Sequence, residues 1–242
     1  MRVFVTHLFT LLKRYAVKCS LILVLYALVI GCANQTELAK QSLILKIHSE
    51  YPVEFRNLVN YPGNVSCGEY KSFGKWGGGT KFLPFIFRAQ QIDTHPIKLD
   101  VQIFCASDPA ASIYAKLGID TSIYLEQELE HVQEDFHQLS AALEIYYQRN
   151  HTYPSARKGL EALVSPEKHG SKPGPLENGR YLDRLPQDPW KRAYFYQGAG
   201  LAGVKHEPEY FTLGKDAKLG GKNENADIKT IYIKYLDHIK TM

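Results

Sequence analysis

The stretch DTSIYLEQELEHVQEDFHQLSAALEIYYQRNHTYPSARKGLEAL, residues 120–163, decides the fold of the second half of this chain. Its apolar residues recur at alternating intervals of four and three, at Leu125, Leu129, Val132, Phe136, Leu139, Leu143 and Tyr146. This spacing predicts a long amphipathic helix that buries one face. Asp120 and Thr121 are candidate N-cap residues. We expect the helix to run to about Arg149, because the chain must leave helical geometry ahead of Pro154.

Short strands are expected after this helix. Residues 192–196 and 209–213 are rich in aromatic and β-branched residues, and residues 228–233 fit a third strand or edge. A short helix over residues 159–164, capped by Ser155, precedes them. One long helix packed on a small antiparallel sheet is an α+β arrangement, which we assign to a domain at residues 119–242.

Residues 1–31 have the pattern of a signal peptide. Basic residues up to Lys18 are followed by the apolar run CSLILVLYALVI at residues 19–30. Twelve residues suit the core of a signal peptide and fall short of the roughly 20 that span a membrane. We therefore expect the chain to be exported.

The apolar run ends in LVIGC, residues 28–32, which resembles a bacterial lipobox. The resemblance implies that a lipid is attached to Cys32 and that the protein is a lipoprotein. An aspartate after the cysteine usually retains such proteins at the inner membrane, so Ala33 implies the outer membrane and a periplasm-facing chain. The alternative is an uncleaved signal anchor in which Cys32 is incidental.

The charge balance argues against nucleic acid as a partner. The formal net charge is +4, but four of the 29 basic residues precede Cys32. The remaining 25 basic residues match the 25 acidic ones, so the exported part is close to neutral. Binding to nucleic acid depends on an excess of positive charge, which is missing here.

The cysteines support export. Of the four cysteines, Cys19 lies in the signal and Cys32 is the lipid candidate, which leaves Cys67 and Cys105. An oxidising periplasm would allow these two to form a disulfide. Such a bridge would stabilise the fold by roughly 4 kcal/mol in the chain-entropy model. Two buried free thiols are the alternative.

A small β-rich domain is expected at residues 43–118, after a polar tether at residues 32–42. The runs at 82–88 and 99–105 are candidate strands, and Pro84 places the first at a sheet edge. Residues 43–47 fit a helix or a strand. The Gly-rich loop at 68–80 lacks the Gly-Lys-Ser/Thr ending of a phosphate-binding loop, so a turn between strands is the simpler interpretation.

Four motifs in the last part of the chain carry a resemblance to a known family. Their order is YPSARKGLEALVSP, LPQDPW, YFTLGKDAKLGG and then NENADI. Together they resemble the periplasmic domain of the major pseudopilin of type II secretion, over about residues 120–230. The resemblance implies a pilin-like fold and protein partners, among them components of the secretion apparatus.

The resemblance also implies a calcium site in the C-terminal loop. Its ligands would be the carbonyl of Leu213 and the side chains of Asp216, Asn223 and Asp227. The residue types suit Ca²⁺, which takes six to eight oxygen ligands from carboxylates, amides and carbonyls. Lys215, Lys218 and Lys222 would weaken cation binding unless they point outward. A solvated surface loop is the alternative interpretation.

The N-terminus departs from the family. A pseudopilin is cut after a glycine, and the product begins Phe-Thr-Leu with a glutamate at its fifth position. The stretch at residues 9–12 is FTLL, but Leu8 replaces the glycine and Lys13 replaces the glutamate. We infer that the apolar half-helix through which pilins assemble is absent, which favours a docking domain over a filament subunit.

No pattern in the sequence indicates an enzyme. None of the nine histidines has a metal-ligand spacing with Cys or Glu, and no serine lies in a Gly-x-Ser-x-Gly elbow. We therefore expect a non-enzymatic, periplasm-facing lipoprotein with a calcium-binding, pseudopilin-like interaction domain of the secretion apparatus. The alternative is a ligand-binding module of the cell envelope that reuses the pilin fold outside secretion.

Overall fold

The computed structural model describes residues 35–242 except 75–76, 79–80, 123–127 and 199–206. The chain divides into two compact units, Met1–Ser107 and Asp108–Met242. The sequence placed this boundary after residue 118. It lies earlier because helix α3 (Pro109–Leu117) packs against the C-terminal helix α5 (Ile233–Lys240) of the second unit.

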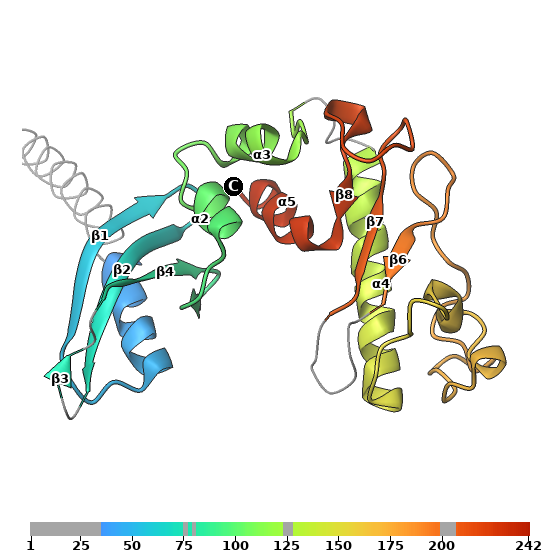
Figure 1. Ribbon diagram of the computed structural model, residues 1–242, viewed down its shortest axis with the longest axis horizontal. Helices are drawn as coiled ribbons and strands as arrows, with labels where there is room; N and C mark the ends of the chain where they lie inside the picture. The colour runs from blue at the N-terminus through green and yellow to red at the C-terminus, as the bar shows by residue number, and fades with distance from the viewer. Residues whose placement is uncertain (1–34, 75–76, 79–80, 123–127, 199–206) are drawn as a thin grey trace, which may run out of the picture. The chain divides into compact units, whose positions relative to one another are not determined.

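An antiparallel sheet forms the centre of the first unit (Figure 1). Its strands follow the order β1-β2-β4-β5, and β3 pairs with the end of β2. Their bounds are β1 (Val53–Tyr61), β2 (Val65–Gly74), β3 (Gly77–Gly78), β4 (Leu83–Arg88) and β5 (Gln91–Asp93). Pro84 does not put β4 at the sheet edge, because β2 and β5 flank this strand. Pro84 is tolerated since β5 reaches only as far as Ile86.

A helix over residues 35–47 covers one face of this sheet. Ala39 and Leu43 are fully buried and belong to one cluster with Tyr70, Phe85 and Phe87. The tether predicted at residues 32–42 is therefore wrong from residue 35 onward. Apolar residues recur at intervals of four in this segment, with polar residues between them. On a helix these apolar residues form one stripe, which is buried against the sheet.

The predicted strand at residues 99–105 is a helix, α2 (Lys98–Phe104). The alternation of apolar and polar residues there also fits a helical face, on which Asp100, Ile103 and Phe104 are buried. The Asp100 carboxylate accepts a hydrogen bond of 3.4 Å from the backbone N–H of Ile97 and so satisfies one donor at the helix start.

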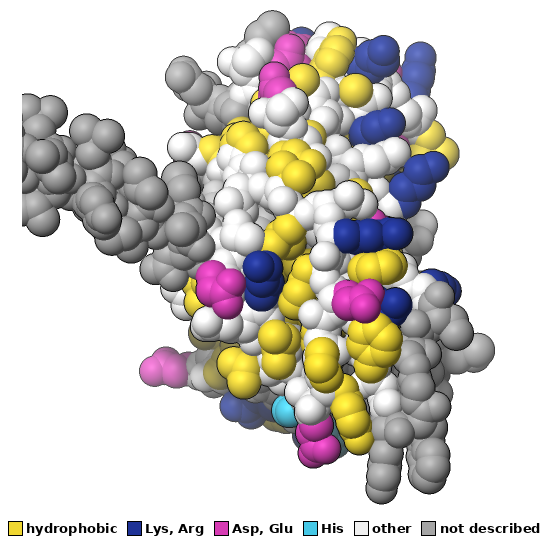
Figure 2. Space-filling model, turned by 90° about the vertical axis from the view of Figure 1, so that its left-hand side faces the viewer, with side chains coloured by type: hydrophobic (Ala, Val, Ile, Leu, Met, Phe, Trp, Pro, Cys, Tyr) yellow, Lys and Arg dark blue, Asp and Glu magenta, His cyan; other side chains and the backbone are white. Residues whose placement is uncertain are grey.

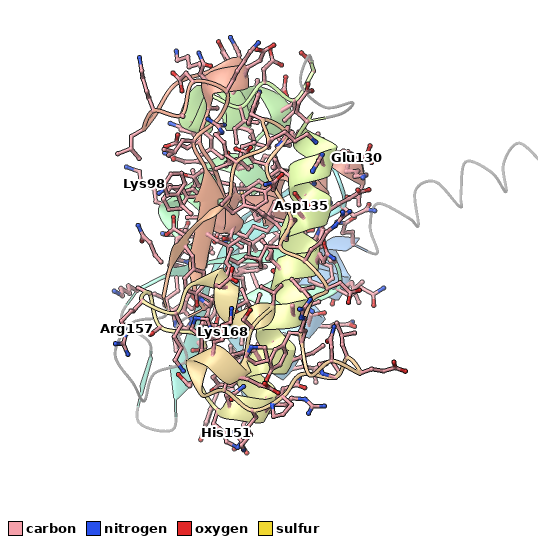
Figure 3. All side chains as sticks on the ribbon, turned by 90° about the vertical axis from the view of Figure 1, so that its right-hand side faces the viewer. Lys98, Glu130, Asp135, His151, Arg157 and Lys168 are labelled. Atoms are coloured by element: carbon pink, nitrogen blue, oxygen red, sulfur yellow. A yellow bond between two sulfur atoms is a disulfide. The ribbon has the colours of Figure 1, made fainter. Side chains whose placement is uncertain are left out.

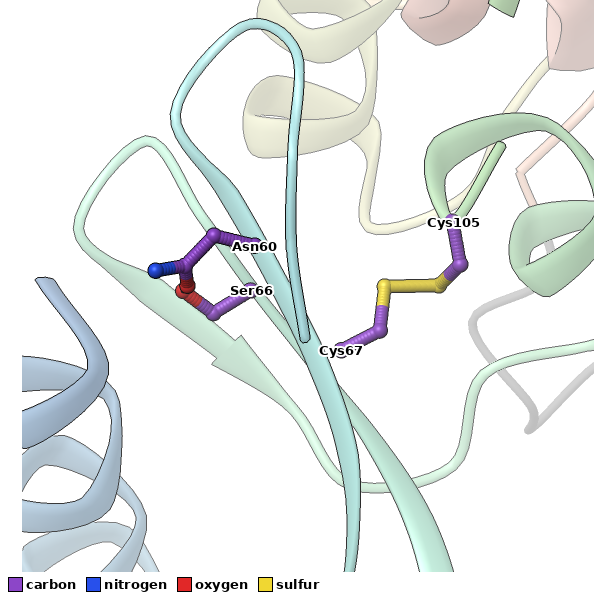
Figure 4. Close-up of a disulfide and its surroundings, with 4 residues drawn as sticks. All are labelled: Asn60, Ser66, Cys67 and Cys105. Atoms are coloured by element: carbon purple, nitrogen blue, oxygen red, sulfur yellow. A yellow bond between two sulfur atoms is a disulfide. The ribbon is translucent and has the colours of Figure 1, made fainter. Parts of the chain in front are cut away.

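Neighbouring residues of β2 anchor the two faces of the sheet (Figure 4). Cys67 is joined to Cys105, directly after α2, in a disulfide with 6.0 Å between the Cα atoms. Ser66 points to the opposite face, as alternation along a strand requires. Its hydroxyl donates to Asn60 Oδ1 over 2.6 Å, and the Asn60 side chain in turn contacts Thr36 in the first helix. The strand therefore ties both covering helices to the sheet.

Paired charges link strands β1 and β2 of the first unit. Arg56 lies 2.9 Å from Glu69, and Lys71 lies 3.0 Å from Glu54, each pair crossing from β1 to β2. The Arg56 guanidinium beside Glu69 holds the pKa of that carboxyl below its usual range. Figure 2 shows hydrophobic, basic and acidic side chains interspersed over the middle of its face, with several basic side chains along the upper right edge.

The second unit is built on α4 (Glu128–Asn150). The predicted stripe is confirmed: Leu129, Val132, Phe136, Leu139, Leu143 and Tyr146 are all buried, and Leu125 lies outside the described residues. The expected N-cap at Asp120 or Thr121 stays a prediction, because residues 123–127, which lie between it and Glu128, are outside the described residues.

The stripe of α4 packs against a small antiparallel sheet, which makes the unit α+β as predicted (Figure 1). The order is β6 (Phe195–Gln197), β7 (Glu209–Thr212) and β8 (Ile228–Lys229). The ring of Tyr210 meets that of Phe136 at 5.0 Å, edge to face, and its hydroxyl donates to the Phe136 carbonyl over 3.0 Å. Short 3-10 helices complete the unit: η1 (Leu160–Leu163), η2 (Glu167–His169), η3 (Asn223–Asn225) and η4 (Thr230–Tyr232).

The predicted strand at residues 228–233 is only partly a strand. It ends at Lys229, and the chain turns through η4 into α5, where Ile233, Tyr235 and Leu236 are buried. The spacing of these residues suits a helix better than a strand. Helix α5 packs on α4 and α3, and Lys240 pairs with Glu130 at 2.6 Å. In the described part of the chain, no helix has the length and apolar content needed to cross a membrane.

Candidate cation-binding loop

The four predicted calcium ligands lie in one loop between β7 and β8. The strand register pairs Phe211 with Lys229 and Thr212 with Ile228. Continuing that register sets Leu213 opposite Asp227 at the mouth of the loop, while Asp216 and Asn223 lie farther along it. The strand pairing therefore sets Leu213 and Asp227 opposite each other, and it does not by itself bring Asp216 or Asn223 to them.

The carboxylate of Asp227 carries the clearest sign of a missing ligand. Its Oδ2 accepts a hydrogen bond of 3.0 Å from the backbone N–H of Gly220. Its Oδ1 is buried and has no hydrogen-bond partner among the described residues. A buried carboxylate oxygen without a partner is costly, and a cation would offset that cost. The donor set thus fits a hard cation at this atom.

Two glycines let the loop fold back on itself. Gly220 and Gly221 have φ angles of 84° and 111°, which side chains rarely adopt. A Cβ on Gly221 would lie 2.2 Å from the carbonyl oxygen of Asn225. This close approach packs the turn at Gly220 and Gly221 against Asn225, and the N–H of Gly220 contacts the Asp227 carboxylate from the same turn.

Two of the three lysines that were expected to weaken cation binding contact other side chains. Lys215 pairs with Glu224 at 2.5 Å, and this contact raises the pKa of Lys215 above its usual value. The ammonium of Lys222 lies 5.8 Å from the ring centre of Tyr114 in α3. Their charges therefore add less repulsion than the sequence suggested.

The loop supplies few acidic ligands. In the part of the chain that the structure describes, no three His, Cys, Asp or Glu side chains group as a metal site. Asp216 is exposed, and its carboxylate accepts a hydrogen bond of 3.1 Å from the N–H of Lys218. Asn223 is also exposed. A cation here would depend on Asp227, Asp216 and carbonyl oxygens such as that of Leu213.

Helix α3 holds the loop from outside. It ends at Gly118, whose φ angle is 75° and whose carbonyl accepts a hydrogen bond of 2.8 Å from the N–H of Asn223. A Cβ on Gly118 would lie 2.6 Å from the carbonyl oxygen of Gly221. No sequence pattern predicts this contact, because Gly118 and Gly221 are far apart along the chain.

A buried carboxylate organises the base of the loop. Asp188 is 1% exposed and accepts hydrogen bonds from the N–H groups of Trp190 and Arg192 and from the Thr212 hydroxyl, at 2.7–3.0 Å. Its ion pair with the Arg192 guanidinium measures 2.9 Å. That guanidinium also donates to the carbonyl of Gly214, where the loop begins. Sequence reasoning saw Asp188 only within the LPQDPW motif and missed this role.

The other predicted site residues lie in the first unit or outside the described residues. Cys67 and Cys105 form the disulfide of the first unit. Cys32, the lipid candidate, and the departures at Leu8 and Lys13 lie outside the described residues. Tyr210 is 1% exposed and packs in the core.

Most of the second unit is similar to known proteins. Residues 125–231 match the family model described as type II secretion system (T2SS), protein G. The C-terminal domain is pseudopilin-like. The match begins after α3 and stops before α5, so both helices and the whole first unit lie outside it. The pseudopilin-like part therefore contains α4, the three-stranded sheet and the loop between β7 and β8.

Individual relatives agree with the family match. Type II secretion system core protein G of Pseudomonas aeruginosa is 38% identical over 94 residues, 39% of this chain and 64% of that protein. The Vibrio cholerae protein of the same name is 40% identical over 90 residues, 37% of this chain and 59% of that protein. The chain thus spans less than two thirds of the length of these relatives.

One solved structure is also similar. It is the major pseudopilin from the type 2 secretion system of enterohaemorrhagic Escherichia coli, 26% identical, with a TM-score of 0.30. The similarity covers 43% of this chain and 84% of that one.

Proposed function

We propose that this protein is a non-enzymatic, lipid-anchored component of the cell envelope. Its pseudopilin-like domain holds Ca²⁺ and docks onto protein components of a type II secretion apparatus. The observation that carries the proposal is the family match over residues 125–231, the part that contains the cation-binding loop. The matched relatives are named as core proteins of that system.

The calcium part of the proposal rests on the orphaned oxygen of Asp227. Asp227 and Asp216 would supply the charge, and the Leu213 carbonyl and the Asn223 amide would supply neutral oxygens. A bound cation would offset the desolvation of Asp227 and draw the two ends of the loop together. The Arg192 contact to Gly214 supports this role, because it fixes the backbone where the loop begins.

The anchor is proposed from the sequence and from the disulfide. The lipobox-like residues 28–32 would place a lipid on Cys32 and leave the rest of the chain facing the periplasm. A disulfide between Cys67 and Cys105 suits an exported protein, because cytosolic thiols are kept reduced. Ala33 favours the outer membrane as the site of anchoring.

Docking is proposed in place of polymerisation. The chain has basic Lys13 and Arg14 where an apolar assembly helix would continue, and the first unit adds a disulfide-linked domain ahead of α4. The alternative, an envelope module that binds a ligand outside secretion, has no observation that favours it over the family match. We therefore place the role of the chain in contacts with partners that recognise the pseudopilin-like domain.

Crosslinking in cells tests this function. The full chain, tagged at its C-terminus, is crosslinked in growing bacteria and captured under denaturing conditions, and the attached proteins are identified by mass spectrometry. We expect components of the type II secretion apparatus. A Cys32→Ser variant serves as the control for anchoring and should leave the membrane fraction. Recovery of other envelope proteins alone, from cells that express the apparatus, would contradict the proposal.

A further inference from the structure

A polar groove crosses the second unit between α4 and the loop at residues 184–191. Its volume is about 480 Å³, within the range of sites that bind small groups. From α4 come His131, Asp135 and Gln138, which share one helix face because they are spaced by four and three residues. From the loop come Arg184, Gln187 and Lys191. The lining thus contains three basic side chains, two amides and one carboxylate.

The single carboxylate is already engaged. Asp135 accepts a hydrogen bond of 2.6 Å from the hydroxyl of buried Tyr194, and its carboxylate lies 3.2 Å from His131 Nε2. The Asp135 side chain is only 13% exposed, and burial raises the pKa of its carboxyl. Its charge therefore faces the protein more than the groove, and it does little to neutralise the loop.

The two loop cations are unpaired within the described residues. Arg184 and Lys191 are exposed and take part in no ion pair there. The backbone that presents Lys191 is nevertheless fixed, because the N–H of Lys191 donates to the Asp188 carbonyl and the N–H of Asp188 donates to the Arg192 carbonyl, each at 2.8 Å. A bridge between Gln187 and Ala193 closes the same turn. The charge of Lys191 is thus presented from an ordered backbone, which lowers the backbone entropy cost of binding an anion.

We propose that this groove binds a carboxylate presented by an acidic segment of a protein partner. Arg184 offers a planar fork that matches two carboxylate oxygens, and Lys191 adds a point charge. The amides of Gln138 and Gln187 can donate to oxygens that remain unsatisfied. This inference rests on the proposed docking role and adds the chemistry of the surface that is recognised.

Direct binding of a defined peptide tests the groove without any secretion component. The purified full chain is titrated into a fluorescein-labelled hexaglutamate peptide at about 0.15 M salt, where charges beyond about 8 Å are screened. Fluorescence anisotropy should rise to saturation. The double variant Arg184→Glu/Lys191→Glu should lose about tenfold or more in affinity. Asp135→Asn should change the affinity less than twofold, because the Asp135 charge faces the protein and the Asn side chain keeps an acceptor for Tyr194.

The matched control carries the same charge change elsewhere. Arg157→Glu/Lys168→Glu alters two exposed cations that lie farther along the domain, toward the end of α4 with His151 (Figure 3). This control should change the affinity less than twofold. Equal loss in both double variants, or no saturable binding by the wild-type chain, would overturn the inference. Tighter binding of a hexaphosphoserine peptide that does not depend on Arg184 would also overturn it.

The outcomes separate this inference from the proposed function. Peptide binding that depends on Arg184, together with failure to capture secretion components, would leave the groove standing and reject the apparatus as partner. Capture of those components by the Arg184→Glu/Lys191→Glu variant at wild-type yield would support the apparatus as partner and reject the groove as the surface that docks onto it.

Discussion

Asp188 and Arg192 form a 2.9 Å ion pair beneath the loop that follows β7. The carboxylate is 1% exposed, and the guanidinium reaches on to the carbonyl of Gly214. The pair therefore does more than offset its own desolvation: it connects the turn at 188–192 to the start of the loop between β7 and β8.

Replacing Asp188 with Asn should strongly destabilise the second unit. The change leaves the Arg192 guanidinium without its counter-charge in a partly buried position, which costs roughly 3 kcal/mol or more. Thr212→Val removes one hydroxyl donor from the same carboxylate and should cost about 1 kcal/mol. Urea denaturation followed by fluorescence of Trp190 measures both. Equal effects of the two substitutions would contradict the view that the ion pair is the larger contribution.

Gly118→Ala should weaken calcium binding. A methyl group there would approach the Gly221 carbonyl and would be strained at a φ of 75°. The hydrogen bond from Asn223 to Gly118 would then shift, and the loop would lose its outer support. Calorimetric titration should show a severalfold higher Kd for Ca²⁺. Gly170→Ala is the control, since Gly170 has a similar φ of 63° with open space around it. An unchanged Kd in Gly118→Ala would show that α3 does not position the loop.

Alkaline pH should destabilise the second unit partly through Tyr210. Burial raises the pKa of the Tyr210 hydroxyl to about 12, from an ordinary value of 10.0. The folded state therefore favours the neutral phenol, and this stabilisation is present below pH 10 and is lost as the pH rises toward 12. Urea midpoints between pH 9 and 12 should fall less steeply in Tyr210→Phe than in wild type. Parallel curves would contradict this assignment.

Reducing the disulfide should destabilise the first unit alone. The bridge closes a loop with a sequence separation of 38, so its loss should cost roughly 4 kcal/mol in the chain-entropy model. The chain has two tryptophans, Trp76 and Trp190, one in each unit. A Trp190→Phe variant therefore reports on the first unit, and Trp76→Phe on the second. An unfolding midpoint of the first unit that is the same with and without reductant would contradict the prediction.

The long helix could be predicted because one strong signal dominates it. Seven apolar residues over residues 125–146 fit a helical period, and the six described ones are buried. The tether and the strand at 99–105 were mistaken because short segments carry weak periodicity. Residues 35–47 and α2 take their form from the core they cover, in which Leu43 and Phe104 are buried.

The candidate site was predictable only in part. Asp216, Asn223 and Asp227 could be named because the motif resemblance gives their order along the chain. The contacts that hold them could not, because Gly118 and Arg192 are distant in sequence and act through backbone carbonyls. Every residue has a backbone carbonyl, so the sequence does not show which carbonyl accepts a hydrogen bond. The orphaned Oδ1 of Asp227 is likewise a property of packing.

Calcium titration of the full chain is the measurement that tests the central claim most directly. Thermal melting is recorded with excess chelator and with Ca²⁺ at about 100 times its Kd, where binding to one site adds about 2.7 kcal/mol to the folding free energy. We predict a rise in Tm for wild type and for the matched control Asp183→Asn. Asp227→Asn should show no rise, and its Tm in chelator should not fall, because the change removes the charge of a carboxylate whose Oδ1 is buried without a hydrogen-bond partner among the described residues. A wild-type Tm that ignores calcium, or a full shift in Asp227→Asn, would contradict the account.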